Sequence, residues 1–316
     1  MKKAVVIPLI IVGSVFVVAG SVLLGLGLSN EIKQEEILTH TYEIKEAVTN
    51  FDLKLNTADL EFKVSTDGTN KIVLEEKEKQ YHEVKEENGT LFINAIDTKP
   101  WYEKIFMFSF KKMTVTFYLT ETSYETFNLK SATGDVLIPG DFTFENETIE
   151  LSTGDINSKA IVNKALSIKT NTGDVTLSEI KPESLTVTTD TGNTNLENVE
   201  VTNDVVLSAS TGRINVKNSK AVNANIKTST GKVNLEGYVG SGSLEINTST
   251  GDVVIADSDA ASINIATSTG DVNATFLTGK SISYETRTGD VNVPSSIGEP
   301  CHIKTSTGDI TVAIIG

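Results

Sequence analysis

The stretch LSIKTNTGDVTL, residues 166–177, holds the unit from which most of this chain is built. Leu166 and Ile168 alternate with polar residues before Gly173, and the alternation resumes at Val175 after it. Alternation with period two on both sides of a glycine predicts a strand, a corner and a second strand. We expect the glycine to lie where φ is positive or where two backbones crowd.

This unit is repeated along the chain. Thr-Gly recurs in phase every 19 or 20 residues from the middle of the chain to its end. A period that regular indicates one structural unit stacked on itself. The ten glycines are Gly134, Gly154, Gly173, Gly192, Gly212, Gly231, Gly251, Gly270, Gly289 and Gly308.

A meander of hairpins and a parallel β-solenoid both fit strands joined by glycine corners. Equivalent positions carry the same residue type, however, and threonines expected to face inward recur three residues before the glycine. Like residues stack when copies lie in register, so we expect a parallel β-solenoid of about ten rungs. These threonines are Thr170, Thr189, Thr228, Thr248, Thr267, Thr286 and Thr305.

An earlier, irregular section precedes the array. Phe51 to Phe62 resembles one more copy, with Ala58 in place of the glycine. Residues 71–74 and 90–95 are expected to be strands, and the charge-rich residues 75–88 between them a solvated connection. We therefore divide residues 31–316 into an acidic stalk or first strand (31–49), an irregular start of the solenoid (50–126) and the regular array (127–316). The chain stops inside its last rung, which is expected to leave an open strand edge.

Residues 1–30 are expected to be a membrane anchor. After Lys2 and Lys3 the residues up to Leu28 are nearly all apolar or glycine, and about 20 such residues suffice to span a bilayer. A cleaved signal peptide is the alternative, with a possible site at residues 19–21. An uncleaved anchor predicts a single-pass protein of the cell membrane, with its amino terminus in the cytoplasm and its carboxy-terminal domain outside.

Composition limits the partners. The formal net charge of −15 disfavours nucleic acid. The one cysteine, Cys301, lies at a position expected to face inward, and no Cys/His spacing suggests a metal site. His40, His82 and His302 are expected in distant parts of the fold, and no Gly-x-Ser-x-Gly setting is present. We expect no enzyme activity and no cofactor.

Aspartate often follows the repeat glycine, so stacked rungs would align a row of carboxylates. Bound calcium is conceivable, but Asn193, Arg213 and Lys232 interrupt the row and the known calcium-binding repeat is different. We interpret these residues as exposed turn residues, with each aspartate bonding to its own turn. The aspartates are Asp135, Asp155, Asp174, Asp252, Asp271, Asp290 and Asp309.

An aromatic cluster interleaved with lysines is the one candidate contact site. These rings either cap the solenoid core or contact a partner or the membrane interface, where such segments suit the headgroup region. The candidate contact residues are Trp101, Tyr102, Phe106, Phe108 and Phe110.

The repeated Ser/Thr-Thr-Gly-Asp motif behind a lysine-initiated anchor resembles the bacterial putative-adhesin β-strand-repeat family, a domain of unknown function that includes Lia-type envelope-stress proteins. Clear copies are Ser152–Ile156, Asn171–Val175, Ser249–Val253, Ser268–Val272 and Ser306–Ile310. The resemblance covers roughly residues 45–316. It implies a surface-exposed β-solenoid linked to adhesion or envelope stress, and it supplies no catalytic or binding residues.

These observations favour a non-enzymatic, membrane-anchored surface solenoid that contacts the envelope or a protein partner. A spacer without a ligand and a carbohydrate-active solenoid enzyme remain the alternatives.

Overall fold

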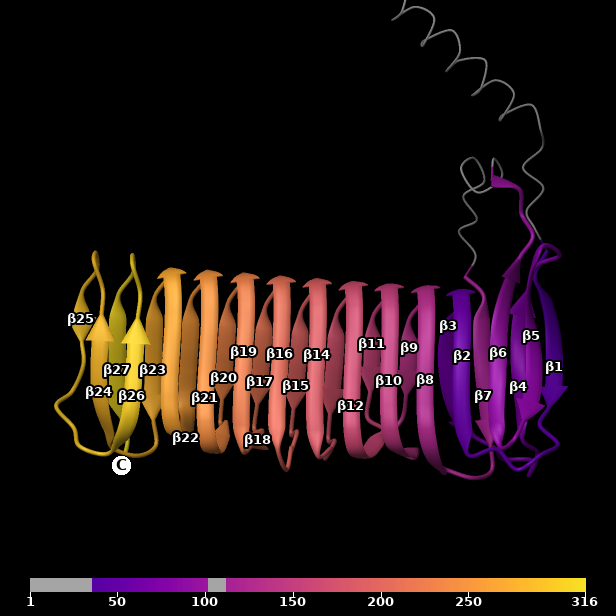
Figure 1. Cartoon of the computed structure of the whole chain (residues 1–316), viewed down its shortest axis with the longest axis horizontal. Coiled ribbons are helices and arrows are strands. Elements are labelled where there is room, and N and C mark those ends of the chain that lie inside the picture. Colours follow the sequence, from indigo (N-terminus) through magenta and orange to yellow (C-terminus); the bar gives the residue numbers. More distant parts are fainter. Residues whose placement is uncertain (1–35, 102–111) are drawn as a thin grey trace, which may run out of the picture.

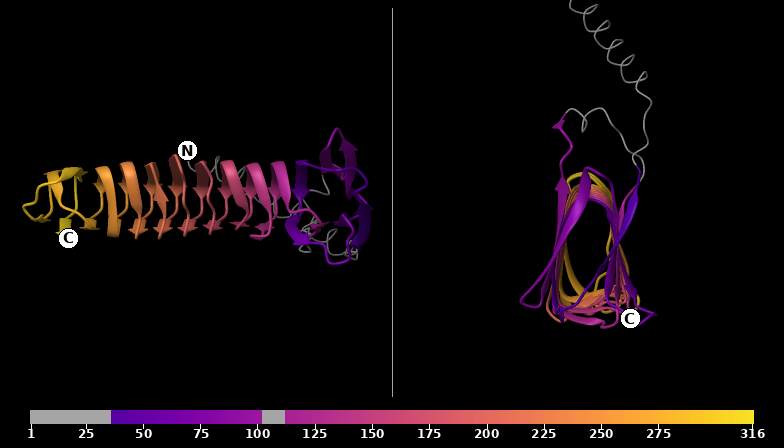
Figure 2. Two further views of the ribbon diagram at one scale, coloured as in Figure 1. Left: turned by 90° about the horizontal axis from the view of Figure 1, so that it is seen from below. Right: turned by 90° about the vertical axis from the view of Figure 1, so that its right-hand side faces the viewer.

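The computed structural model describes residues 36–101 and 112–316. Within them every named element is a β-strand, and the strands coil into a long rod with two facing sheets (Figure 1). Seen end-on in Figure 2, successive rungs superpose. The predicted parallel β-solenoid is thus confirmed for these residues. No helix among them is long and apolar enough to cross a membrane, and the expected anchor lies outside the described residues.

One sheet holds the strands that run into the glycine corners. In order along the rod they are β5 (Gln80–Glu87), β6 (Thr90–Asp97), β2 (Asn50–Thr57), β8 (Ser123–Thr133), β10 (Thr143–Thr153), β12 (Ile161–Thr172), β14 (Ser184–Thr191), β16 (Asp204–Thr211), β19 (Asn223–Thr230), β21 (Val239–Thr250), the second half of β22 (Val253–Thr269), β26 (Glu299–Lys304) and β24 (Lys280–Glu285). The two-residue β18 (Lys220–Ala221) pairs with the start of β21.

The other sheet holds the strands that leave the corners. In order along the rod they are β1 (Leu38–Glu43), β4 (Lys71–Glu76), β7 (Thr114–Leu119), β3 (Asp59–Val64), β9 (Val136–Ile138), β11 (Ile156–Ser158), β13 (Val175–Ser178), β15 (Thr194–Glu197), β17 (Ile214–Lys217), β20 (Val233–Glu236), the first half of β22, β23 (Val272–Phe276), β27 (Ile310–Ile314) and β25 (Val291–Asn292).

The glycine is required at the corners because successive backbones touch there. Gly212 has a φ of +155°, and a Cβ atom built on it would lie 1.8 Å from the carbonyl oxygen of Gly192. The same close approach begins at the irregular copy, where a Cβ on Gly134 would meet the carbonyl oxygen of Ala58. Ala58 therefore does stand in for the glycine, and residues 50–64 form a true rung.

The repeat threonines face inward as predicted, and most have a polar role. Thr189 donates from its hydroxyl to the carbonyl oxygen of Gly173 in the preceding rung, and Thr267 donates in the same way to Gly251. Thr286 alone of the seven is not buried, because its rung is the outermost one. Cys301 is buried as expected, and burial raises the pKa of its thiol to about 12.

The rungs do not follow chain order at either end of the rod. At the amino end the rung of β6 and β7 lies outside that of β2 and β3, although it comes later in the chain. At the carboxyl end the final rung, β26 and β27, inserts between β22/β23 and the rung of β24 and β25. The expectation that the last rung carries the open edge is therefore wrong. The outermost strands are β24 and β25.

The expectation of a solvated connection at residues 75–88 is also wrong. These residues complete β4 and form β5, which pairs antiparallel with β6. Together with β1, which pairs antiparallel with β4, they cover the amino end of the coil. A tight aromatic core lies beneath: Phe51, Phe62 and Phe117 contact one another, with Phe62 and Phe117 stacked 4.7 Å apart.

Candidate functional site at the open end of the rod

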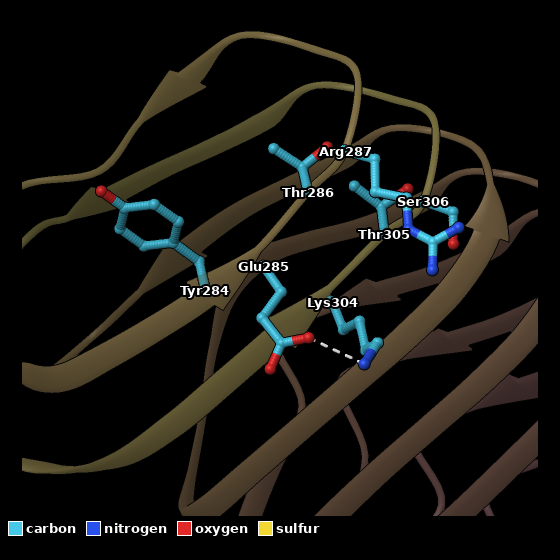
Figure 3. A pocket seen from close by; sticks show the side chains of 7 residues that line it. All are labelled: Tyr284, Glu285, Thr286, Arg287, Lys304, Thr305 and Ser306. Carbon is cyan, nitrogen blue, oxygen red and sulfur yellow. Dashed lines mark ion pairs between the residues drawn. The ribbon is translucent and has the colours of Figure 1, made fainter.

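The carboxyl end of the rod holds a pocket of about 430 Å³. It forms where β24 reaches its glycine corner, beside the end of β26 (Figure 3). Its walls combine one tyrosine ring, charged groups of both signs and three aliphatic hydroxyl groups. The lining residues are Tyr284, Glu285, Thr286, Arg287, Lys304, Thr305 and Ser306.

Tyr284 lies in the pocket because of its place in the repeat. Its register partner Ile303 is fully buried and continues the inward ladder from Ile265. In inner rungs a further rung covers this position on each side, whereas in β24 it is covered on one side only. The Tyr284 side chain is accordingly 50% exposed. The end of the apolar core is thus accessible here, with Ile282 and Val291 partly buried beside it.

The pocket holds three charged side chains, two of which form an ion pair with each other. Lys304 Nζ lies 2.7 Å from Glu285 Oε2, and the hydrogen bond from Lys304 holds the pKa of that carboxyl below its ordinary value. Arg287 forms no ion pair with any described residue. It occupies the position held by Ser306 in the adjacent rung and by Asn171 or Asp190 farther along the rod. A carboxylate or another oxyanion is the natural partner for an unpaired guanidinium with hydroxyl groups beside it.

At the start of β24, Lys280 links the outer rung to the two rungs next to it. Its ammonium group is fully buried, 2.8 Å from Glu299 Oε2 and 3.0 Å from the carbonyl oxygen of Ala260, and it also pairs with Asp259. Burial would lower the pKa of Lys280, but the hydrogen bonds to Asp259 and Glu299 outweigh it and raise that pKa. The Lys280 contacts reach past the inserted rung, because Asp259 belongs to β22. This network stabilises the observed rung order.

The aspartates of the row accept backbone hydrogen bonds, but the donors are not the ones that the sequence suggested. The backbone N–H of Asp155 donates to Oδ1 of Asp135 at 2.9 Å, and that of Asp174 donates to Asp155 at 2.8 Å. These carboxylates thus accept from the next rung, not from their own turn, whereas Asp290, on the outermost rung of the described residues, only donates, to Asp309. The acceptor series is interrupted at Arg213 and Lys232, whose side chains offer no acceptor. In the described residues no group of three or more His, Cys, Asp or Glu side chains could hold a metal ion.

Two of the histidines expected in distant parts of the fold meet at one carboxylate. Glu76 is buried; its Oε2 lies 2.6 Å from Nδ1 of His40, and its Oε1 lies 3.1 Å from Nδ1 of His82. Burial lowers the pKa of His82, against the opposing effect of Glu76. The cluster joins β1, β4 and β5, so it holds the amino-terminal cover together. No spacing in the sequence signals this cluster, because His40 and Glu76 are 36 residues apart and meet only when β1 pairs with β4.

The aromatic candidate site lies almost wholly outside the described residues. Trp101 is 72% exposed, next to the end of β6. Tyr102, Phe106, Phe108 and Phe110 are among the residues not described. The pocket residues Tyr284 and Arg287 were missed in the sequence, where Arg287 stands out only as a departure from Ser, Asn or Asp in the repeat frame.

Three solved structures are similar to this chain. A putative adhesin from Parabacteroides distasonis has a TM-score of 0.52 and 10% identity, over 76% of this chain and 97% of that chain. A putative adhesin from Bacteroides fragilis has a TM-score of 0.42 and 18% identity, over 77% and 97% of the two chains. A putative lipid binding protein from Parabacteroides distasonis has a TM-score of 0.42 and 16% identity, over 88% and 97%. At 10% identity, the first of these structures supports the fold alone.

No curated protein matches this chain. The family model described as Toastrack DUF4097 matches residues 48–237 and 202–316, which together span most of the chain. The chain therefore belongs to the Toastrack DUF4097 family.

Proposed function

We propose that this chain is a non-enzymatic surface rod, held in the membrane by residues 1–30, that contacts an envelope or protein partner through its carboxyl end. The observation that carries the proposal is the difference between the two ends. The amino end is covered by β1, β4 and β5, whereas the carboxyl end leaves β24 and β25 each paired on one side and opens a pocket.

The position of the first described residues supports the same orientation. They lead into β1 at the amino end of the rod, far from β24 at the other end (Figure 1). An anchor that precedes β1 would therefore leave the carboxyl end as the part farthest from the attachment point. A rod of stacked rungs keeps that distance, because each rung is bonded to its neighbours along the whole length.

A second contact is proposed near the membrane. Trp101 follows β6, so it lies at the covered end of the rod. Aromatic and lysine side chains suit the interface between lipid headgroups and water. We propose that Trp101 and its neighbours steady the base of the rod at the membrane surface.

The test measures binding of the purified full-length chain to cell-wall, membrane and membrane-protein fractions, with the melting temperature recorded for each variant. Arg287→Glu is expected to reduce saturable binding without changing stability, since Arg287 is exposed and has no ion pair among the described residues. The double variant Trp101→Ala/Phe106→Ala is expected to affect only membrane association. Unaltered binding by Arg287→Glu would refute the carboxyl-end contact, and absence of binding to every fraction would leave the spacer as the better description.

A further inference from the structure

We propose that the open end binds an extended segment of a partner protein, which adds to β24 as a strand and places a carboxylate beside Arg287. The inference rests on the proposed function and names the chemistry of the partner. Three features of the described residues carry it: a free strand edge, an uncovered apolar ladder and an unpaired arginine at its end.

In the described residues the strand edge is free from Ile282 onward, whereas at its start the Lys280 N–H donates to the Ser296 hydroxyl. β24 pairs with β26 in parallel and with no other described strand, and β25 likewise pairs only with β27. Toward the inner side, for example, the carbonyl oxygen of Glu285 accepts from the N–H of Thr305. The backbone groups on the other side of β24 face outward, and such an edge is a ready template for one more strand.

The side chains beside this edge specify alternation in the added strand. Ile282 and Tyr284 occupy ladder positions next to Cys301 and Ile303, both of which are buried. A strand laid on β24 would cover Ile282 and Tyr284 with every second residue, so those residues should be apolar.

The charged side chains at the end of β24 determine which residue the bound segment should carry there. Beyond Tyr284, Glu285 is already paired with Lys304, whereas Arg287 has no ion pair among the described residues. A partner carboxylate placed two residues before the equivalent of the corner glycine would meet Arg287. A guanidinium binds a carboxylate through charge-assisted hydrogen bonds, with more geometric selectivity than an ammonium group.

A second copy of this chain is a poorer occupant. Joined end to end, it would offer its own β24, in which the one carboxylate, Glu285, is engaged by Lys304. Nothing in that strand would neutralise Arg287. A partner with an acidic extended segment is therefore favoured by charge complementarity.

The repeat itself provides a probe of this chemistry. The peptide LTVTTDTGN copies residues 185–193 and aligns with residues 282–290 when the two glycines are matched. Leu185 then lies over Ile282, and Asp190 over Arg287. The matched control peptide carries Asp190→Ser, which leaves the apolar alternation unchanged.

Binding of each fluorescently labelled peptide to the full-length chain is measured by anisotropy. The Asp peptide is expected to bind about tenfold more tightly than the Ser peptide, as one charged hydrogen-bonded pair would give. Arg287→Glu is expected to abolish that preference and to favour a peptide carrying Asp190→Lys. Arg213→Glu, an exposed arginine on an inner rung, is the control and should leave the preference intact.

Equal binding of the Asp and Ser peptides would overturn the assignment of Arg287 as a carboxylate site. Absence of peptide binding, or end-to-end dimers of the chain detected by ultracentrifugation, would overturn the partner-strand proposal. If Arg287→Glu still reduces binding to envelope fractions in either case, the binding end stands and only the partner chemistry is wrong. If it does not, the proposed function itself fails.

Discussion

Glu147 should make the stability of this rod depend on pH in a way that no exposed carboxylate would. It lies in the inward ladder between Phe127 and Leu166, and it is fully buried. Neither of its carboxylate oxygens has a hydrogen-bond partner among the described residues. Burial alone raises its pKa from 4.5 to about 8. The folded protein therefore holds a proton that the unfolded chain releases near pH 4.5.

The sign and size of the effect follow from linkage. A pKa raised on folding contributes stability that is fully present below pH 4.5 and is lost as the pH rises to about 8. At about 1.4 kcal/mol per unit, the loss across this window is about 5 kcal/mol. Glu147→Gln removes the titration while keeping the shape, and Glu147→Leu restores the apolar ladder that neighbouring rungs have at this position.

The assay is urea denaturation at intervals from pH 4 to 9. The difference in unfolding free energy between wild type and Glu147→Gln should grow in favour of the variant as the pH rises, and then level off above about pH 8. Other acidic groups titrate in both proteins and cancel. Glu150→Gln is the matched control, since Glu150 lies on the same strand with an exposed ion pair to Lys130. Parallel pH profiles for wild type and Glu147→Gln would refute the reasoning.

Two further predictions concern the glycine corner. Gly212→Ala should lower the unfolding free energy by about 3 kcal/mol or more in urea denaturation, because its Cβ would lie 1.8 Å from the Gly192 carbonyl oxygen and its φ is positive. Gly140→Ala, whose nearest contact would be an ordinary 3.5 Å, should cost far less, and equal costs would contradict the backbone-contact argument. Lys232→Asn should raise stability by about 1 kcal/mol, since the Asp252 N–H gains an acceptor like those elsewhere in the series. An unchanged or lower denaturation midpoint would show that this acceptor series does not contribute to stability.

The repeat made the middle of the fold predictable. In-phase glycines and alternating residues such as Leu166 and Ile168 set the stacking register, and the structure keeps that register rung after rung. The same frame could also have found Glu147, which stands seven residues before Gly154 as Leu166 stands before Gly173. Its charge departs from the apolar pattern only when the copies are aligned on their glycines.

The two ends could not be predicted in this way. Every rung carries a similar edge, so the motif around Gly289 or Gly308 does not say which rung lies outside the other. That order depends on contacts between distant residues, such as Lys280 with Asp259 and Glu299. The pocket depends on the order too, because it opens only where β24 is the last strand.

Hydrogen exchange of the backbone amides in β24 and β26 tests the account most directly, because the open binding end exists only if the final rung lies inside the preceding one. With β26 between β22 and β24, the amides of residues 301–304 should be protected, whereas the amides of Ile282 and Tyr284, which point away from β26, should exchange quickly. The reverse pattern, with residues 280–285 protected and residues 299–304 exposed, would contradict the account, since the edge, the pocket and the Arg287 site would then no longer exist as described.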